Sequence, residues 1–144
     1  MPGDTGLHVK TLPAEINQLE KALEFIRAIL ESAACPPAVE QAVELAVEEI
    51  FVNIARYAYP ETKPGAVRIG CKVERTLHHS RLIIIFADRG KPYNPLEHPD
   101  PDISVAIEER EIGGLGILMV KRVMDKVQYD YTKGWNRLAL MKSW

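Results

Sequence analysis

Glu49 and Asn53 lie four residues apart in 41–59, the most apolar helix-like stretch of the chain. This spacing places a carboxylate and an amide on one face of a helix, one turn apart. The same face would carry Leu45 and Ala46, so the two polar groups adjoin small and apolar side chains. Polar groups in such surroundings cost free energy unless something pairs with them. We therefore interpret the pair as part of a functional site.

A second candidate lies at the end of an apolar run, 82–87. Asp88 closes this expected strand, and Gly90 and Tyr93 follow it. A carboxylate there can accept a hydrogen bond from a ligand amine held against the apolar strand, and glycine lets the backbone come close to that ligand. Taken alone, an Asp-x-Gly sequence after a strand is more often an ordinary turn.

A glycine-rich segment opens the last expected helix, with Gly113, Gly114 and Gly116 around Leu115. Glycines let backbone N–H groups crowd an anion, and the N-terminal end of a helix dipole adds positive charge, so phosphate is the expected ligand. The chain lacks a G-x-x-x-x-G-K-[ST] loop, and no strand immediately precedes the glycines. The segment therefore fits neither a P-loop enzyme nor a Rossmann dinucleotide domain.

Helical and strand periodicities predict the elements that carry these groups. Apolar residues recur at three- and four-residue steps from Ile16 to Leu30, and they alternate with polar residues after Val67. The strand that ends at Asp88 is apolar on both faces, so we expect it at the centre of a sheet. We predict an α/β two-layer sandwich, with a mixed, mostly antiparallel sheet and helices on one face. The expected helices span 16–30, 41–59 and 115–125, and the expected strands span 7–12, 67–73, 81–88, 127–131 and 138–142.

Residues 89–112 follow neither periodicity. They contain four prolines and a run of charged residues before the glycine-rich segment. A loop of about twenty residues is long for a compact domain, and such loops are usually functional lids or disordered segments. We predict a lid over about 91–113.

Composition indicates one ordinary domain over 1–144. The chain has 47% hydrophobic and 26% charged residues and a net charge of −2, which offers no electrostatic footprint for nucleic acid or an anionic membrane. Its longest apolar run, 82–87, is too short to span a bilayer, and its first residues lack the pattern of a signal peptide. Cys35 and Cys71 have neither C-x-x-C nor metal-ligand spacing, so we interpret them as reduced thiols. We expect a cytoplasmic protein.

The order of these segments resembles that of the N, G1 and G2 boxes of the GHKL ATPase superfamily: E-x-x-x-N on a helix, D-x-G after a strand, a long lid, then G-G-L-G into a helix. Three segments are similar to the anti-sigma-factor serine/threonine kinases of the RsbW and SpoIIAB type. They span 88–95, 113–117 and 134–142. The resemblance covers nearly the whole chain, from about 7 to 142.

The resemblance implies a Bergerat ATP-binding fold with ATP and Mg²⁺ as its ligands. It also implies phosphoryl transfer to a serine of a small STAS-domain anti-anti-sigma protein, sequestration of a sigma factor, and a homodimer. Carried over by position, Glu49 would be the general base and Asn53 would hold Mg²⁺. Asp88 would read the adenine amino group. Gly90 would lie beneath the adenine ring, and Tyr93 belongs to the same motif. Gly114 and Gly116 would form the lid hinge and bring backbone amides to the phosphates. Gly113 and Leu115 would lie beside them.

Three positions depart from the family pattern. Some members carry a lid arginine where this chain has Ile112, so either Arg110 or Lys91 is left to reach the phosphates. Relatives often have threonine at the position of Trp135, whose replacement removes a hydroxyl expected near the nucleotide. Phenylalanine is commoner than tyrosine at the position of Tyr93.

Two other functions compete with a serine kinase. One is a nucleotide-gated regulator that uses ATP only to order its lid and dock a partner, without kinase activity. The other is a fragment of a sensor histidine kinase, which has less support because no dimerisation helix with a phosphoacceptor histidine precedes the expected ATP domain.

Overall fold

A five-stranded sheet forms the frame of the molecule in the computed structural model, which describes residues 6–97 and 114–144. The strands are β1 (His8–Pro13), β2 (Ala66–Arg75), β3 (Ser80–Asp88), β4 (Lys126–Thr132) and β5 (Trp135–Ser143). Their order is β1-β2-β3-β5-β4, and every neighbouring pair is antiparallel. The predicted two-layer architecture is confirmed, with β3 at the centre of the sheet and β1 at its edge.

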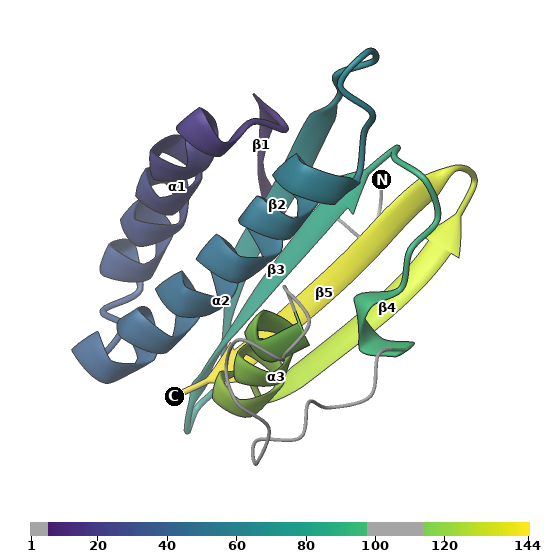
Figure 1. Ribbon diagram of the computed structural model, residues 1–144. Helices are drawn as coiled ribbons and strands as arrows, with labels where there is room; N and C mark the ends of the chain where they lie inside the picture. The colour runs from purple at the N-terminus through teal and green to yellow at the C-terminus, as the bar shows by residue number, and fades with distance from the viewer. Residues whose placement is uncertain (1–5, 98–113) are drawn as a thin grey trace.

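Three helices cover one face of this sheet (Figure 1). They are α1 (Leu19–Ser32), α2 (Pro37–Tyr57) and α3 (Gly114–Val123), and the short 3-10 turns η2 (Ile16–Gln18) and η3 (Pro95–Glu97) lie between elements. Helix α2 crosses the middle of the sheet, with α1 on one side and α3 on the other (Figure 1). In the described parts of the chain, no helix is long and apolar enough to cross a membrane.

Alternation along the strands separates a helix-covered face from an open one. In β3 the side chains of Leu82, Ile84 and Phe86 are buried, whereas those between them are more exposed. The antiparallel register sets Ile84 opposite Leu140 and Phe86 opposite Leu138, so buried rows run across the sheet. A shift of one residue would send every apolar side chain to the open face, so this pattern specifies the register.

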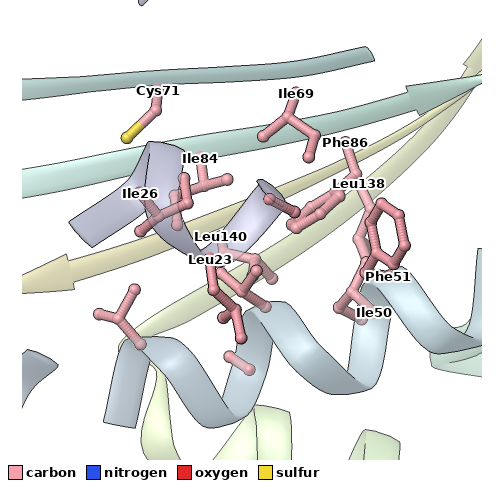
Figure 2. Packing of buried hydrophobic residues seen from close by; sticks show 14 of the residues in the cluster. Leu23, Ile26, Ile50, Phe51, Ile69, Cys71, Ile84, Phe86, Leu138 and Leu140 are labelled. Carbon is pink, nitrogen blue, oxygen red and sulfur yellow. The ribbon is translucent and has the colours of Figure 1, made fainter. Parts of the chain in front are cut away.

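The helices complete the core with their apolar stripes. Leu23 and Ile26 of α1 and Ile50 and Phe51 of α2 pack against the buried rows of the sheet (Figure 2). Each such side chain contributes about 1.5–3 kcal/mol when fully buried. Cys71 belongs to the same core, and burial raises the pKa of its thiol to about 12. The site described below is therefore supported by a continuous packed layer.

Two predicted helix starts are wrong by three or four residues, and the three predicted helix ends each differ by two residues. Helix α2 begins at Pro37, four residues earlier than predicted, because proline is well suited to the first position of a helix. Ile16 lies in the η2 turn and is 49% exposed, so it does not belong to the apolar stripe of α1. The buried stripe of that helix comprises Ala22, Leu23, Ile26 and Leu30.

Candidate functional site

A pocket lies beside α2, at the ends of β3, β4 and β5. Its floor is apolar, with Ile50 of α2, Phe86 of β3 and Leu138 of β5. Polar groups border it at Asn53, Asp88, Lys91 and Asn136. Three tyrosines and three apolar residues complete its wall: Tyr57, Tyr93, Tyr129, Ile54, Ala58 and Pro95. The structure thus brings together Asn53, Asp88 and Tyr93, which the sequence singled out from separate segments.

Glu49 lies one helical turn before Asn53 and is half-buried. Its carboxylate faces the first turn of α3, because a Cβ atom placed on Gly116 would stand 2.2 Å from Oε2 of Glu49. Only glycine leaves room for the carboxylate at this point in its present position. The contact joins the E-x-x-x-N helix to the glycine-rich segment.

Asp88 is 6% exposed and ends β3 at the border of the pocket. Its Oδ1 atom accepts hydrogen bonds from the backbone N–H of Gly90 at 2.9 Å and from Nδ2 of Asn136 at 3.0 Å. Among the described residues, no donor reaches the second oxygen, Oδ2. That oxygen is therefore left to accept a hydrogen bond from a ligand.

The loop after β3 is tied to the end of α2. A Cβ atom on Gly90 would stand 2.2 Å from the carbonyl oxygen of Ala58, and the N–H of Lys91 donates to that same oxygen at 3.2 Å. One residue after Ala58, beyond the end of α2, the Tyr59 hydroxyl accepts from the N–H of Arg89 at 2.8 Å. Glycine at position 90 is thus required by a close approach between two backbone segments, beyond any approach to a ligand.

Substitution by alanine is expected to lower the Tm at Gly90 but not at Gly116. Gly90→Ala is expected to destabilise the fold by about 1–3 kcal/mol, because its Cβ would clash with the backbone carbonyl of Ala58, which cannot move without disturbing the end of α2. That corresponds to a fall in Tm of about 3–10 °C. Gly116→Ala meets only the flexible end of Glu49, and alanine favours the helix, so its Tm should stay within about 3 °C of the wild type. Thermal unfolding followed by circular dichroism measures both, and equal losses in the two variants would contradict this placement of the loop.

Asn136 is a site residue that sequence reasoning missed. It is 7% exposed and pairs with Asp88 across β3 and β5. Its Nδ2 donates to Asp88, to the carbonyl oxygen of Lys91 at 3.0 Å and to that of Gly90 at 3.3 Å. The sequence does contain a signal for it. Asn136 lies two residues before Leu138, so both side chains point to the buried face of the strand, where an amide needs hydrogen-bond partners.

Two further donors satisfy the Asn136 oxygen. The backbone N–H of Tyr93 donates to Oδ1 at 3.2 Å, and the Tyr129 hydroxyl donates to the same atom. Burial raises the pKa of the Tyr129 hydroxyl above its ordinary value, so it remains a protonated donor at neutral pH. The asparagine therefore links β4, β5 and the loop after β3.

Trp135 lies on the other face of the sheet. It lines a groove on the open face with Ile85 and Arg137, and the guanidinium of Arg89 stands 5.0 Å from its ring centroid. The expectation that Trp135 removes a hydroxyl beside the ligand is therefore wrong. Strand alternation turns this residue away from the pocket and brings Asn136 to Asp88 instead.

Part of the predicted site lies outside the described residues. This applies to Gly113, to the alternative phosphate contact Arg110 and to the predicted lid beyond residue 97. Gly114 and Leu115 open α3. Lys91, the other candidate for a phosphate contact, borders the pocket.

Asn53 is suited to a divalent cation that also binds phosphate. Its side-chain amide borders the pocket and makes no hydrogen bond with another described residue. In the described ranges, no three His, Cys, Asp or Glu side chains gather into a metal cluster. Mg²⁺ takes few protein oxygens when phosphates supply others. The donor set therefore fits Mg²⁺ held jointly with a nucleotide.

Comparisons with known proteins identify the family of this chain. The family model of the histidine kinase-like ATPase domain matches residues 12–142. The serine/threonine-protein kinase BtrW of Bordetella bronchiseptica is 26% identical over 98 residues, which cover 67% of this chain and 65% of BtrW. The serine-protein kinase RsbW of Bacillus subtilis is 29% identical over 97 residues, which cover 64% of this chain and 58% of RsbW. The chain thus spans about three fifths of the length of these relatives.

Solved structures share the fold at low sequence identity. The RsbU and RsbW domains of Rv1364c from Mycobacterium tuberculosis match with a TM-score of 0.60 and 16% identity, over 94% of this chain and 32% of that one. The histidine kinase domain of the blue-light activated kinase EL346 from Erythrobacter litoralis matches with a TM-score of 0.52 and 13% identity, over 91% and 61% of the two chains. With a family model matching almost its whole length, the chain belongs to the histidine kinase-like ATPase domain family.

Proposed function

We propose that this chain is an ATP-dependent serine/threonine protein kinase and anti-sigma factor of a partner-switching module. Its substrate would be a serine of a STAS-domain anti-anti-sigma protein. Two observations carry the proposal. Asp88 borders an apolar pocket with an oxygen that no donor among the described residues reaches, and Glu49, one helical turn before Asn53 of that pocket, lies against the first turn of α3. Similarity to the kinases BtrW and RsbW supports the same reaction.

Asp88 would bind the adenine ring by accepting a hydrogen bond from its amino group. Ile50, Phe86 and Leu138 supply an apolar surface on which the ring would lie. The triphosphate would extend toward the first turn of α3, whose backbone N–H groups and positive dipole end favour an anion. Lys91 adds a cation at the border of the pocket.

Asn53 would hold Mg²⁺ through its side-chain oxygen, together with the phosphates. When bound, the ion would neutralise negative charge on the phosphates during transfer. Phosphoryl transfer depends mainly on positioning and on such neutralisation, so a single protein oxygen is a sufficient contribution.

Glu49 would act as the general base. The serine oxygen forms a bond to the γ-phosphorus, and the bond from that phosphorus to the β–γ bridging oxygen breaks. ADP leaves with the electron pair, and the Glu49 carboxylate takes the hydroxyl proton. A base with this role contributes about 10²–10⁴-fold to the rate.

The partners follow from the same proposal. The chain would sequester a sigma factor while its STAS partner is phosphorylated, and it would act as a homodimer. This regulation of transcription would take place in the cytoplasm, where ATP is available.

Gly116→Ala is expected to lower phosphotransfer by about 10²-fold, because the new methyl group displaces the Glu49 carboxylate. Gly70→Ala is the matched control, since its Cβ also meets only a flexible side chain, that of Leu7, on the open face of the sheet. Rates of serine phosphorylation at saturating ATP measure the effect. A Gly116→Ala enzyme as fast as Gly70→Ala would contradict the assignment of Glu49.

An assay with labelled ATP and the cognate STAS protein tests the proposed function. Transfer of label to serine supports the kinase. If ATP binds and no label is transferred, the kinase proposal fails and a nucleotide-gated regulator without kinase activity replaces it. A pull-down from the native cell with ATP or ADP present then identifies the partner of each nucleotide state.

A further inference from the structure

Asn136 uses the full hydrogen-bonding capacity of its side chain at the border of the pocket. Nδ2 faces three oxygens, one from Asp88 and two from the backbone of Gly90 and Lys91. Oδ1 faces two donors, the N–H of Tyr93 and the hydroxyl of Tyr129. All five contacts come from the pocket wall or the loop that leaves β3.

These contacts determine the orientation of the amide. Rotating it by half a turn would set its oxygen against a carboxylate and two carbonyl oxygens, and its NH₂ group against two donors. Such like-to-like contacts in a buried site leave polar groups unpaired, which is costly. Asn136 therefore presents a fixed donor to Asp88.

The fixed donor changes what Asp88 can offer to a ligand. Oδ1 of Asp88 already accepts from Asn136 and from the N–H of Gly90, so Oδ2 is the acceptor left for the pocket. A purine with an amino group at its 6-position can donate to that oxygen. A purine with a carbonyl oxygen there would face it acceptor to acceptor.

We propose that Asn136 is a positioning residue that determines base selectivity: it holds Asp88 so that the pocket accepts a 6-amino purine and rejects a 6-oxo purine. The inference rests on the proposed nucleotide site. Asn136 also forms hydrogen bonds with the backbone of Lys91 and Tyr93. It therefore attaches the start of the loop after Asp88 to strand β5. Recognition of the base and the path of this loop thus depend on one side chain.

The test compares ATP with inosine triphosphate, which carries a carbonyl oxygen in place of the 6-amino group. Affinities of the full chain for both nucleotides are measured by calorimetry. The wild type is expected to prefer ATP by about 10- to 100-fold. In Asn136→Ala this preference should fall about tenfold, because Asp88 loses its fixed donor and can turn. A purely structural loss would weaken both nucleotides equally and leave their ratio unchanged.

Two more variants keep the test decisive if Asn136→Ala folds poorly. Tyr129→Phe removes a single donor to Oδ1 of Asn136 and should lower the ATP preference about threefold. Asn136→Thr retains a hydroxyl that can donate to Asp88 and should recover part of the selectivity. A wild type that prefers ATP, with the same preference in all three variants, overturns the inference alone. A wild type that binds neither nucleotide overturns both the inference and the proposed function.

Discussion

Replacing Glu49 with glutamine is expected to lower serine phosphorylation by about 10²–10⁴-fold at saturating ATP. Glutamine keeps the size and shape of the side chain, so it preserves the contact with Gly116. It cannot accept the serine proton. ATP affinity should stay within about twofold, because Glu49 is not part of the pocket wall. Single-turnover kinetics with a fluorescent ATP analogue separate the two quantities.

Glu48 provides the matched control for this variant. It is the adjacent residue of α2, is exposed, and lies off the face that carries Glu49 and Asn53. Glu48→Gln makes the same chemical change to the chain and should retain full activity. If Glu49→Gln phosphorylates serine as fast as Glu48→Gln, then Glu49 is not the base.

Asp88→Asn is expected to weaken ATP binding by about 10- to 100-fold, which corresponds to about 1.4–2.8 kcal/mol. The new amide would keep its oxygen toward the donors of Gly90 and Asn136, so its NH₂ group would face the pocket. An NH₂ group cannot accept a hydrogen bond from the adenine amino group. The same variant should gain affinity for inosine triphosphate relative to ATP, because a carbonyl oxygen can accept from that NH₂ group.

Asp130→Asn serves as the control for charge. Asp130 is exposed on β4 and does not border the pocket, so its loss of charge should leave nucleotide binding unchanged. Calorimetric titrations with ATP and inosine triphosphate give both affinities. An Asp88→Asn chain that binds ATP like the wild type would contradict the role of Asp88 in base recognition.

The fold was predictable because its signals are local. Alternation in 67–73 and the doubly apolar run 82–87 are properties of short windows, and they correctly predicted β2 and a central β3. Boundaries were harder. Strand β5 begins at Trp135, three residues before the predicted start, because the tight turn at Lys133 and Gly134, both with positive φ, sets the pairing of β4 with β5.

The site was predictable only where its members are close in sequence or end an element. The four-residue spacing of Glu49 and Asn53 predicted their shared helix face, and the end of an apolar strand pointed to Asp88. The contacts of Glu49 with Gly116 and of Asp88 with Asn136 join residues far apart in the chain. They arise from helix packing and strand register, which no short window of sequence contains.

The most direct test of the account is to find where the phosphate goes. The chain is incubated with ATP, Mg²⁺ and its cognate STAS protein, and mass spectrometry locates the modified residue. We predict phosphoserine on the STAS protein with the wild type, and none with Glu49→Gln although that variant still binds ATP. Phosphate on a histidine of this chain, or bound ATP with no transfer to serine by the wild type, would contradict the proposed serine kinase.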